Sequence, residues 1–120
     1  MEINIGMDGD VVVLDIVGDL VASTAEELKT QVSKLREKNF NYVLLEMSKV
    51  DFMDSSGLGA CMAVHKILLE NNGMLVLAKP SKSIEKIFQI TRANQKLNIV
   101  PTRHDGIKSL HEKIIEKRQK

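Results

Sequence analysis

The N-terminal residues alternate between apolar and polar positions in a way that predicts a β-hairpin. Ile3 and Ile5 alternate with polar residues, the pair Asp8-Gly9 follows, and residues 11–17 form a second, mostly apolar run. An Asp-Gly pair between two strand-like runs is typical of a tight antiparallel turn. We therefore expect the chain to begin with two antiparallel strands.

The spacing of apolar residues changes to that of a helix after an expected loop at residues 18–22. Apolar positions then recur at three- and four-residue steps, at Ala25, Leu28, Val32 and Leu35. Ser23 or Thr24 is positioned to cap this helix, and acidic residues follow in its first turn, where the helix dipole favours them. Asn39 is the expected stop.

Short apolar runs alternate with helical patterns over the rest of the chain. Strands are expected at residues 42–47, 74–78 and 97–100, and helices at residues 55–70, 81–91 and 104–117. Strands that alternate with helices pair in parallel, and the hairpin adds an antiparallel pair. With 120 residues and no linker, we expect one α/β domain over residues 1–120 with a mixed sheet.

Two carboxylates interrupt the apolar strands and indicate how the sheet is covered. Asp15 and Glu46 each lie inside a run that is otherwise apolar. A strand covered on both faces would bury such a carboxylate without a partner, at a cost of several kcal/mol. We therefore expect about four helices mainly on one face, with the opposite face partly open.

The composition excludes several classes of protein. No apolar run approaches the roughly 20 residues needed to span a bilayer, and the first residues lack the basic and apolar regions of a secretory signal. Cys61 is the single cysteine, so no internal disulfide can form. We expect a cytoplasmic protein that does not insert into a membrane.

The net charge of +1 conceals a basic C-terminal end. From residue 103 onwards there are six Lys or Arg residues against three Asp or Glu residues. Such a segment is usually a solvated helix face. The aromatic residues are too scattered to form a base-stacking platform, so we expect no direct binding of nucleic acid.

The segment Asp54-Ser55-Ser56-Gly57-Leu58-Gly59 carries the strongest signal for function. Ser and Asp are common helix caps, but two glycines in a first helical turn each cost roughly 0.5–1 kcal/mol relative to alanine. Glycines let another backbone approach closely, and helix N-terminal amides favour anions. The pattern indicates a phosphorylation or docking site, and by itself it leaves both serines open as the acceptor.

The run VDFMDSSGLG at residues 50–59 resembles the signature of STAS domains, specifically the bacterial anti-sigma factor antagonists. Gly18-Asp19-Leu20, followed by Thr24 and Leu28, resembles the second motif of that family. The resemblance implies a STAS fold and a regulator without enzymatic activity. Its unphosphorylated form would bind an anti-sigma factor that is a serine kinase, and would thereby release a sigma factor.

The resemblance also assigns roles to individual residues. The kinase would phosphorylate Ser55, which directly follows the Asp of the motif, and a serine phosphatase would reverse this. Ser56 is then the expected helix cap. From the resemblance and the residue pattern together, the expected partner contacts are Asp19, Ser23, Thr24, Asp54, Ser56, Gly57, Leu58, Gly59 and Met62. The family commonly has an acidic residue where this chain has Val21, so partner contact at this loop is expected to differ.

Other STAS modules imply a second reading of the same fold, as a scaffold of a signalling complex or an accessory subunit of a membrane transport system. The expected helix at residues 55–70 is apolar on more than one face. Most of it should belong to the core, with Ala60, Met62 or Ala63 as candidates for an exposed binding surface.

The sequence contains no spacing pattern typical of a catalytic or metal-binding site. Ser55 is not in a Gly-x-Ser-x-Gly pattern, and the three histidines are scattered. Cys61 and His65 make one i,i+4 pair without the second pair that a zinc site needs. We expect no catalytic residue, no cofactor and no metal.

Overall fold

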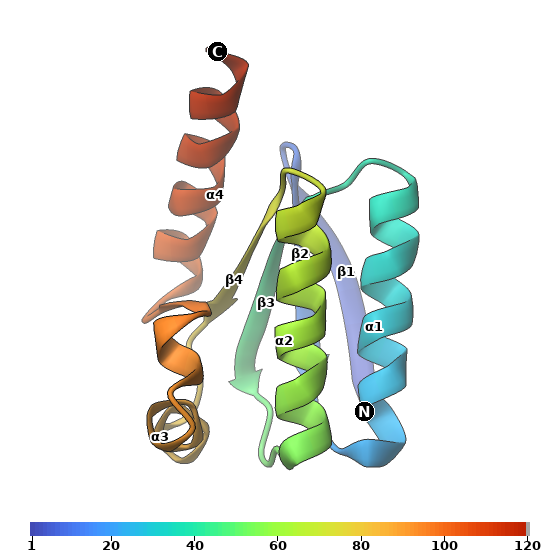
Figure 1. The fold of residues 1–120 in the computed structure, drawn as a ribbon, viewed down its shortest axis with the longest axis vertical. Coiled ribbons are helices and arrows are strands. Elements are labelled where there is room, and N and C mark those ends of the chain that lie inside the picture. The colour runs from blue at the N-terminus through green and yellow to red at the C-terminus, as the bar shows by residue number, and fades with distance from the viewer. Residues whose placement is uncertain (120) are drawn as a thin grey trace.

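The computed structural model describes residues 1–119, which form a five-stranded sheet with helices packed on both faces (Figure 1). The element order is the predicted one, and most boundaries differ from the predictions by one or two residues. The elements are β1 (Glu2–Asp8), β2 (Val11–Val17), α1 (Ala22–Glu37), β3 (Tyr42–Lys49), α2 (Ser55–Glu70), β4 (Met74–Ala78), α3 (Lys82–Ile90), the short 3₁₀ helix η1 (Ala93–Gln95), β5 (Asn98–Val100) and α4 (Arg103–Arg118).

The strands lie in the order β1-β2-β3-β4-β5. β1 pairs with β2 in antiparallel fashion through a turn at Gly9, whose φ of 60° lies in the left-handed region. The other three pairs are parallel, with Leu14 opposite Leu45 and Leu45 opposite Leu77. This confirms the mixed sheet with an N-terminal hairpin. Because β2 to β5 are parallel, the loops that follow them leave the same edge of the sheet.

The main core lies between one face of the sheet and three helices. Alternate strand residues such as Leu14 and Leu45 point to this side, where they pack with Leu28 of α1, Val64 of α2 and Phe88 of α3. The opposite face carries a smaller cluster under α4, built from Val11, Val13, Leu44, Val76, Ala78, Leu110 and Ile114. The expectation that the helices lie mainly on one face is confirmed.

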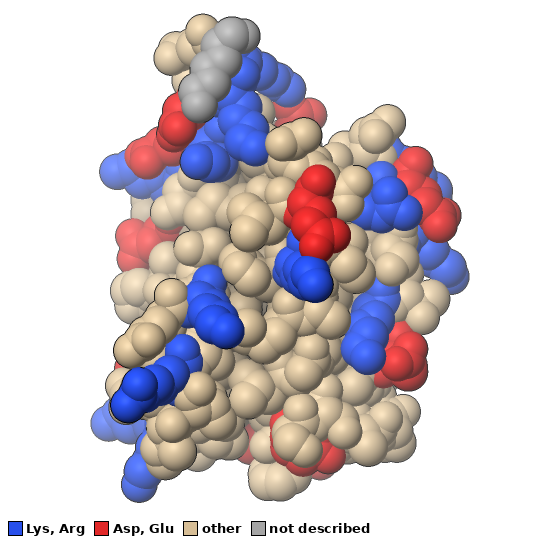
Figure 2. All heavy atoms as spheres, in the orientation of Figure 1, with Lys and Arg blue, Asp and Glu red and all other residues tan. Residues whose placement is uncertain are grey.

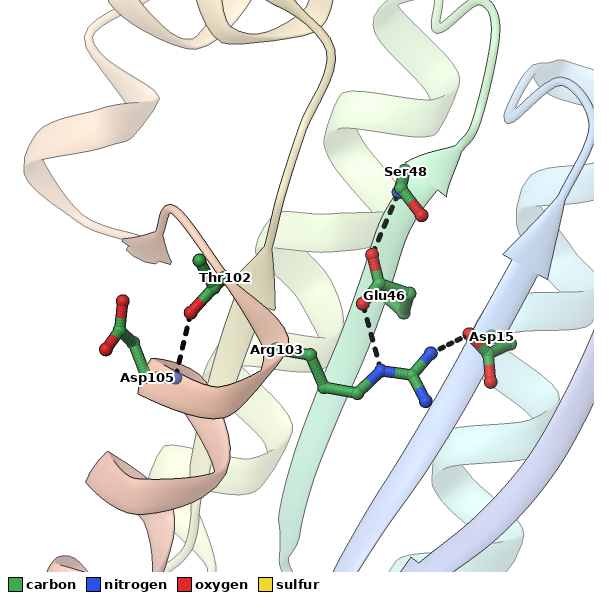
Figure 3. A network of polar contacts seen from close by, with 6 residues as sticks. All are labelled: Asp15, Glu46, Ser48, Thr102, Arg103 and Asp105. Atoms are coloured by element: carbon green, nitrogen blue, oxygen red, sulfur yellow. Dashed lines mark hydrogen bonds and ion pairs between the residues drawn. The ribbon is translucent and has the colours of Figure 1, made fainter.

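An arginine at the start of α4 satisfies the two strand carboxylates (Figure 3). Asp15 lies directly opposite Glu46, and Arg103 donates from Nε to Glu46 Oε1 at 3.0 Å and from its terminal nitrogen to Asp15. The Ser48 amide donates to the other Glu46 oxygen at 3.2 Å. The expectation that both carboxylates lie on an open part of the sheet is wrong for Glu46, which is buried and paired with Arg103. Asp15 stays partly open to solvent, with 34% of its side chain exposed.

Helix α4 is further fixed by polar side-chain contacts to the hairpin. His111 lies 2.9 Å from Asp8, and Arg118 lies 2.7 Å from Asp10. None of the helices within residues 1–119 is both long and apolar enough to cross a membrane.

Candidate functional site

The loops after β2 and β3 are joined by backbone hydrogen bonds. The Leu20 amide donates to the Phe52 carbonyl at 2.9 Å, and the Asp54 amide donates to the Leu20 carbonyl at 3.3 Å. Leu20 and Met53 form an isolated parallel bridge, and both side chains are buried. The two sequence motifs, about thirty residues apart, therefore form one continuous surface.

Asp54 connects the first turns of two helices. Its Oδ1 accepts a hydrogen bond from the Gly57 amide at 2.9 Å, and its Oδ2 accepts one from the Ala22 amide of α1 at 3.1 Å. These bonds, that from Gly57 first, lower the pKa of the Asp54 carboxyl. Asp54 is therefore ionised at neutral pH and holds the loop in place.

The expectation that Ser56 caps α2 is wrong, because Asp54 is the N-cap residue. Ser55 is the first residue of the helix and Ser56 the second, so their hydroxyls take no part in the capping hydrogen bond. Both serines are exposed, and no acidic residue lies within the first helical turn. The two hydroxyls therefore stand at the positively polarised end of a helix and are open to solvent.

The start of α1 also differs from its prediction. The helix begins at Ala22, and Val21 is its N-cap, so neither Ser23 nor Thr24 occupies the cap position. The Thr24 hydroxyl accepts from the Val21 amide at 2.9 Å and donates to the Asp19 carbonyl at 2.8 Å. Thr24 thus fixes the loop from inside the helix, while Asp19 and Ser23 are exposed on the surface beside it.

The two glycines of the motif lie in different surroundings. A Cβ on Gly57 would lie 2.0 Å from the Leu20 carbonyl oxygen, whereas a Cβ on Gly59 would meet nothing within 4 Å. The close approach at Gly57 is therefore made by the loop after β2, not by a partner. Gly59 is exposed, so it is the glycine that leaves the helix surface bare.

The outer flank of α2 is only partly covered. Leu58, Met62 and Ala63 are half-buried, but Ala60 is fully buried, so the expectation that Ala60 could be exposed is wrong. Sequence reasoning missed Phe52, which precedes Asp54 by two residues and is 55% exposed. The presence of an aromatic residue in the loop between β3 and α2 could have indicated a binding surface, because exposed aromatics are enriched at protein interfaces.

The remaining candidate chemical groups are separate from this surface. Cys61 is fully buried, and burial raises the pKa of its thiol to about 12, which keeps it protonated. His65 is half-buried, and burial lowers its pKa. Within residues 1–119, no group of three His, Cys, Asp or Glu side chains could hold a metal ion.

Comparison of the sequence with known proteins identifies a family and related proteins. The STAS domain model matches residues 2–106. An anti-sigma-B factor antagonist from Staphylococcus epidermidis is 31% identical over 74 residues, which are 62% of this chain and 68% of that protein.

Three solved structures, of two different proteins, share the fold. A Thermotoga maritima protein superposes with a TM-score of 0.86 at 23% identity, covering 91% of this chain and 94% of that one. The Bacillus anti-sigma factor antagonist SpoIIAA superposes in its unphosphorylated form with a TM-score of 0.72 at 21% identity, covering 92% and 98%. Its phosphorylated form gives a TM-score of 0.70 at 22% identity, covering 90% and 98%. The chain belongs to the STAS domain family and, within it, to the anti-sigma factor antagonists.

Proposed function

We propose that this protein is a phosphorylation-controlled anti-sigma factor antagonist that acts in the cytoplasm. Its unphosphorylated form binds an anti-sigma factor that is a serine kinase, and this binding releases a sigma factor. The kinase transfers a phosphoryl group to the Ser55 hydroxyl, which ends the binding, and a serine phosphatase restores it. The protein itself supplies a binding surface and no catalytic group.

The observation that carries the proposal is the position of Ser55. It is exposed at the first residue of α2, directly after the capping Asp54 and beside the loop that carries Asp19. A kinase that binds this surface would therefore have the acceptor hydroxyl within its contact area. The solved phosphorylated form of SpoIIAA supports the idea that this fold accepts such a modification.

The surrounding contacts explain how a phosphate could change binding without changing the fold. A phosphoserine adds about −1.5 to −2 charges and three acceptor oxygens. The hydrogen bonds that hold the loop come from Asp54 and from the backbone, not from the Ser55 hydroxyl. Phosphorylation would thus alter the charge at the centre of the partner surface while its supporting bonds remain.

Phosphosite mapping tests the assignment of the acceptor. The wild type, Ser55→Ala and Ser56→Ala would each be incubated with ATP and the serine-kinase anti-sigma factor encoded in the same genome, then analysed by mass spectrometry. We expect phosphorylation of the wild type and Ser56→Ala at residue 55, and none of Ser55→Ala. Phosphate on Ser56 in the wild type would contradict the assignment.

A second candidate function follows from Val21, which is half-buried as the N-cap of α1 where the family commonly has an acid. A less acidic loop would fit an accessory subunit of a membrane transport system or a scaffold of a signalling complex. Affinity capture from the native host separates the two functions. Recovery of a transporter ATPase in place of a kinase-like anti-sigma factor would favour the second.

A further inference from the structure

A groove runs beside the outer flank of α2. Its cavity volume is about 340 Å³, and it lies between α2 and the segment that joins α3 to β5. Leu58 and Met62 form the wall on α2. The opposite side is lined by Thr91, Arg92, Ala93, Gln95 and Lys96.

The groove lies on the same side of α2 as the proposed phosphoacceptor. Ser55 and Met62 are seven residues apart, which is about 20° short of two full helical turns, so both project from one face. Leu58 lies between them, one turn from Ser55. The axial separation of Ser55 from Leu58 is about 4.5 Å and from Met62 about 10.5 Å. The groove therefore begins about one helical turn from Ser55.

The α2 wall of the groove is apolar, the opposite side is partly polar through Thr91 and Gln95, and the rim is cationic. Met62 is a flexible side chain that adapts to different contacts. Arg92 and Lys96 are exposed, and neither takes part in the ion pairs found within residues 1–119. Figure 2 shows basic side chains gathered on the α3 side of this face, beside the uncharged surface over the middle of α2.

The backbone holds Arg92 in an uncommon conformation at the rim. Its φ of 61° lies in the left-handed region, which is disfavoured for a residue with a side chain. Hydrogen bonds from the Arg92 amide to the Gln89 carbonyl and from the Gln95 amide to the Arg92 carbonyl, both at 3.1 Å, fix this turn. The backbone from which the Arg92 side chain leaves is therefore fixed by an ordered turn.

We propose that this groove binds a segment of the partner kinase that carries an apolar side chain flanked by carboxylates. The inference rests on the proposed function and identifies a contact beyond the Ser55 surface. The apolar side chain packs on Leu58 and Met62, and the carboxylates pair with Arg92 and Lys96. Charge complementarity of this kind gives specificity and speeds association.

The same arrangement explains how a phosphate at Ser55 weakens binding. The phosphate would lie one to two helical turns from the groove, a distance comparable with the Debye length of about 8 Å at physiological salt. It would repel the carboxylates of the bound segment and compete with them for Arg92 and Lys96. Phosphorylation of Ser55 would thus weaken the binding of this segment in the groove.

A peptide titration followed by NMR tests the groove without the kinase. The probes are a short peptide with central leucines flanked by glutamates, and the same peptide with lysines in place of the glutamates. We expect the acidic peptide to shift the backbone amides of Leu58, Met62, Arg92 and Lys96, with weaker binding at higher salt. Absence of these shifts, or equal shifts with the lysine peptide, would overturn the proposal.

A charge-matched pair of variants tests the groove in the full reaction. Arg92→Glu/Lys96→Glu and Lys34→Glu/Lys108→Glu change the net charge by the same amount, but Lys34 and Lys108 lie exposed on α1 and α4, which do not line the groove. Thermal unfolding would confirm that all proteins are folded. We expect the groove variant to raise the KM for phosphorylation by the anti-sigma factor kinase about tenfold with an unchanged kcat. The control variant should stay within about twofold of the wild type, because its charges act from outside the contact.

The outcomes separate the two proposals. Equal KM values for all three proteins, without peptide shifts, would refute binding of the kinase segment in the groove and leave the proposed Ser55 switch unaffected. A wild type that the kinase neither binds nor phosphorylates would overturn the proposed function and the partner assigned to the groove.

Discussion

Replacing Gly57 by alanine tests whether the two motif loops are clamped together. The added Cβ would lie 2.0 Å from the Leu20 carbonyl oxygen, 2.8 Å from its carbonyl carbon and 3.0 Å from Met53 Cγ. Real Cβ atoms essentially never approach closer than 3.0 Å, so the loop after β2 must move by about 1 Å. The obstacle is backbone, which cannot rotate away as a flexible side chain would.

The expected loss of stability follows from what this movement disturbs. Overpacking costs about 1–3 kcal/mol, and each of the two backbone hydrogen bonds that Leu20 makes to the neighbouring loop contributes about 1 kcal/mol. Alanine regains about 0.5–1 kcal/mol of helix propensity. We therefore expect Gly57→Ala to lower the free energy of unfolding by about 2–4 kcal/mol, and the melting temperature by roughly 10 °C.

Gly59→Ala is the matched control, because a Cβ there meets nothing within 4 Å. It should raise the free energy of unfolding by about 0.5–1 kcal/mol through helix propensity alone. Urea unfolding of both variants and the wild type measures the difference. A Gly57→Ala protein that is as stable as the wild type would refute the clamp between the loops, and equal destabilisation by both variants would refute its location at Gly57.

Four further outcomes are expected. Gly59→Ala should weaken partner binding despite its higher stability, as measured by calorimetry, because its methyl group occupies the bare helix surface; unchanged affinity would place the contact elsewhere. Arg103→Met should lower the free energy of unfolding by about 1–3 kcal/mol in urea, because buried Glu46 loses its cationic partner; an unaffected protein would show that the pair contributes nothing. The folded-state pKa of Asp54 is lowered, so its stabilising effect is present above the unfolded-state pKa and is lost as pH falls through the folded-state value. The difference in unfolding free energy between the wild type and Asp54→Ala should then be largest at neutral pH and shrink below about pH 4, and a difference that does not vary with pH would contradict this. Cys61 should react with a thiol reagent at pH 8 only after unfolding in urea, since its thiol is buried and protonated; rapid labelling of the folded protein would contradict that burial.

The order of the elements was predictable because each one is marked by local periodicity. The alternation at Ile3 and Ile5 with the Asp8-Gly9 turn predicts the hairpin, and helical spacing marks the four helices. The choice of cap was less predictable. Asp54 and Ser56 are both good capping residues, and only the three-dimensional geometry shows that the Asp54 carboxylate reaches the Gly57 and Ala22 amides together.

Long-range contacts were beyond the reach of sequence reasoning. Arg103 lies 57 residues from Glu46 and 88 from Asp15, and no local pattern connects them. The same holds for the groove, since the spacing on α2 puts Ser55 and Met62 on one side of a helix but does not show what faces them. The glycines were correctly identified as unusual, but the role of Gly57 depends on the Leu20 carbonyl, which only the fold brings close.

The most direct test of the Ser55 switch is the affinity of the anti-sigma factor kinase for four forms of the protein: unphosphorylated, phosphorylated at Ser55, Ser55→Ala and Ser55→Asp. Circular dichroism and thermal unfolding of each form would be measured alongside. We predict tight binding by the unphosphorylated and Ser55→Ala forms and weak binding by the phosphorylated and Ser55→Asp forms, with the fold unchanged in all four. Equal affinity of all four forms, or loss of the folded structure on phosphorylation with binding retained, would contradict the account.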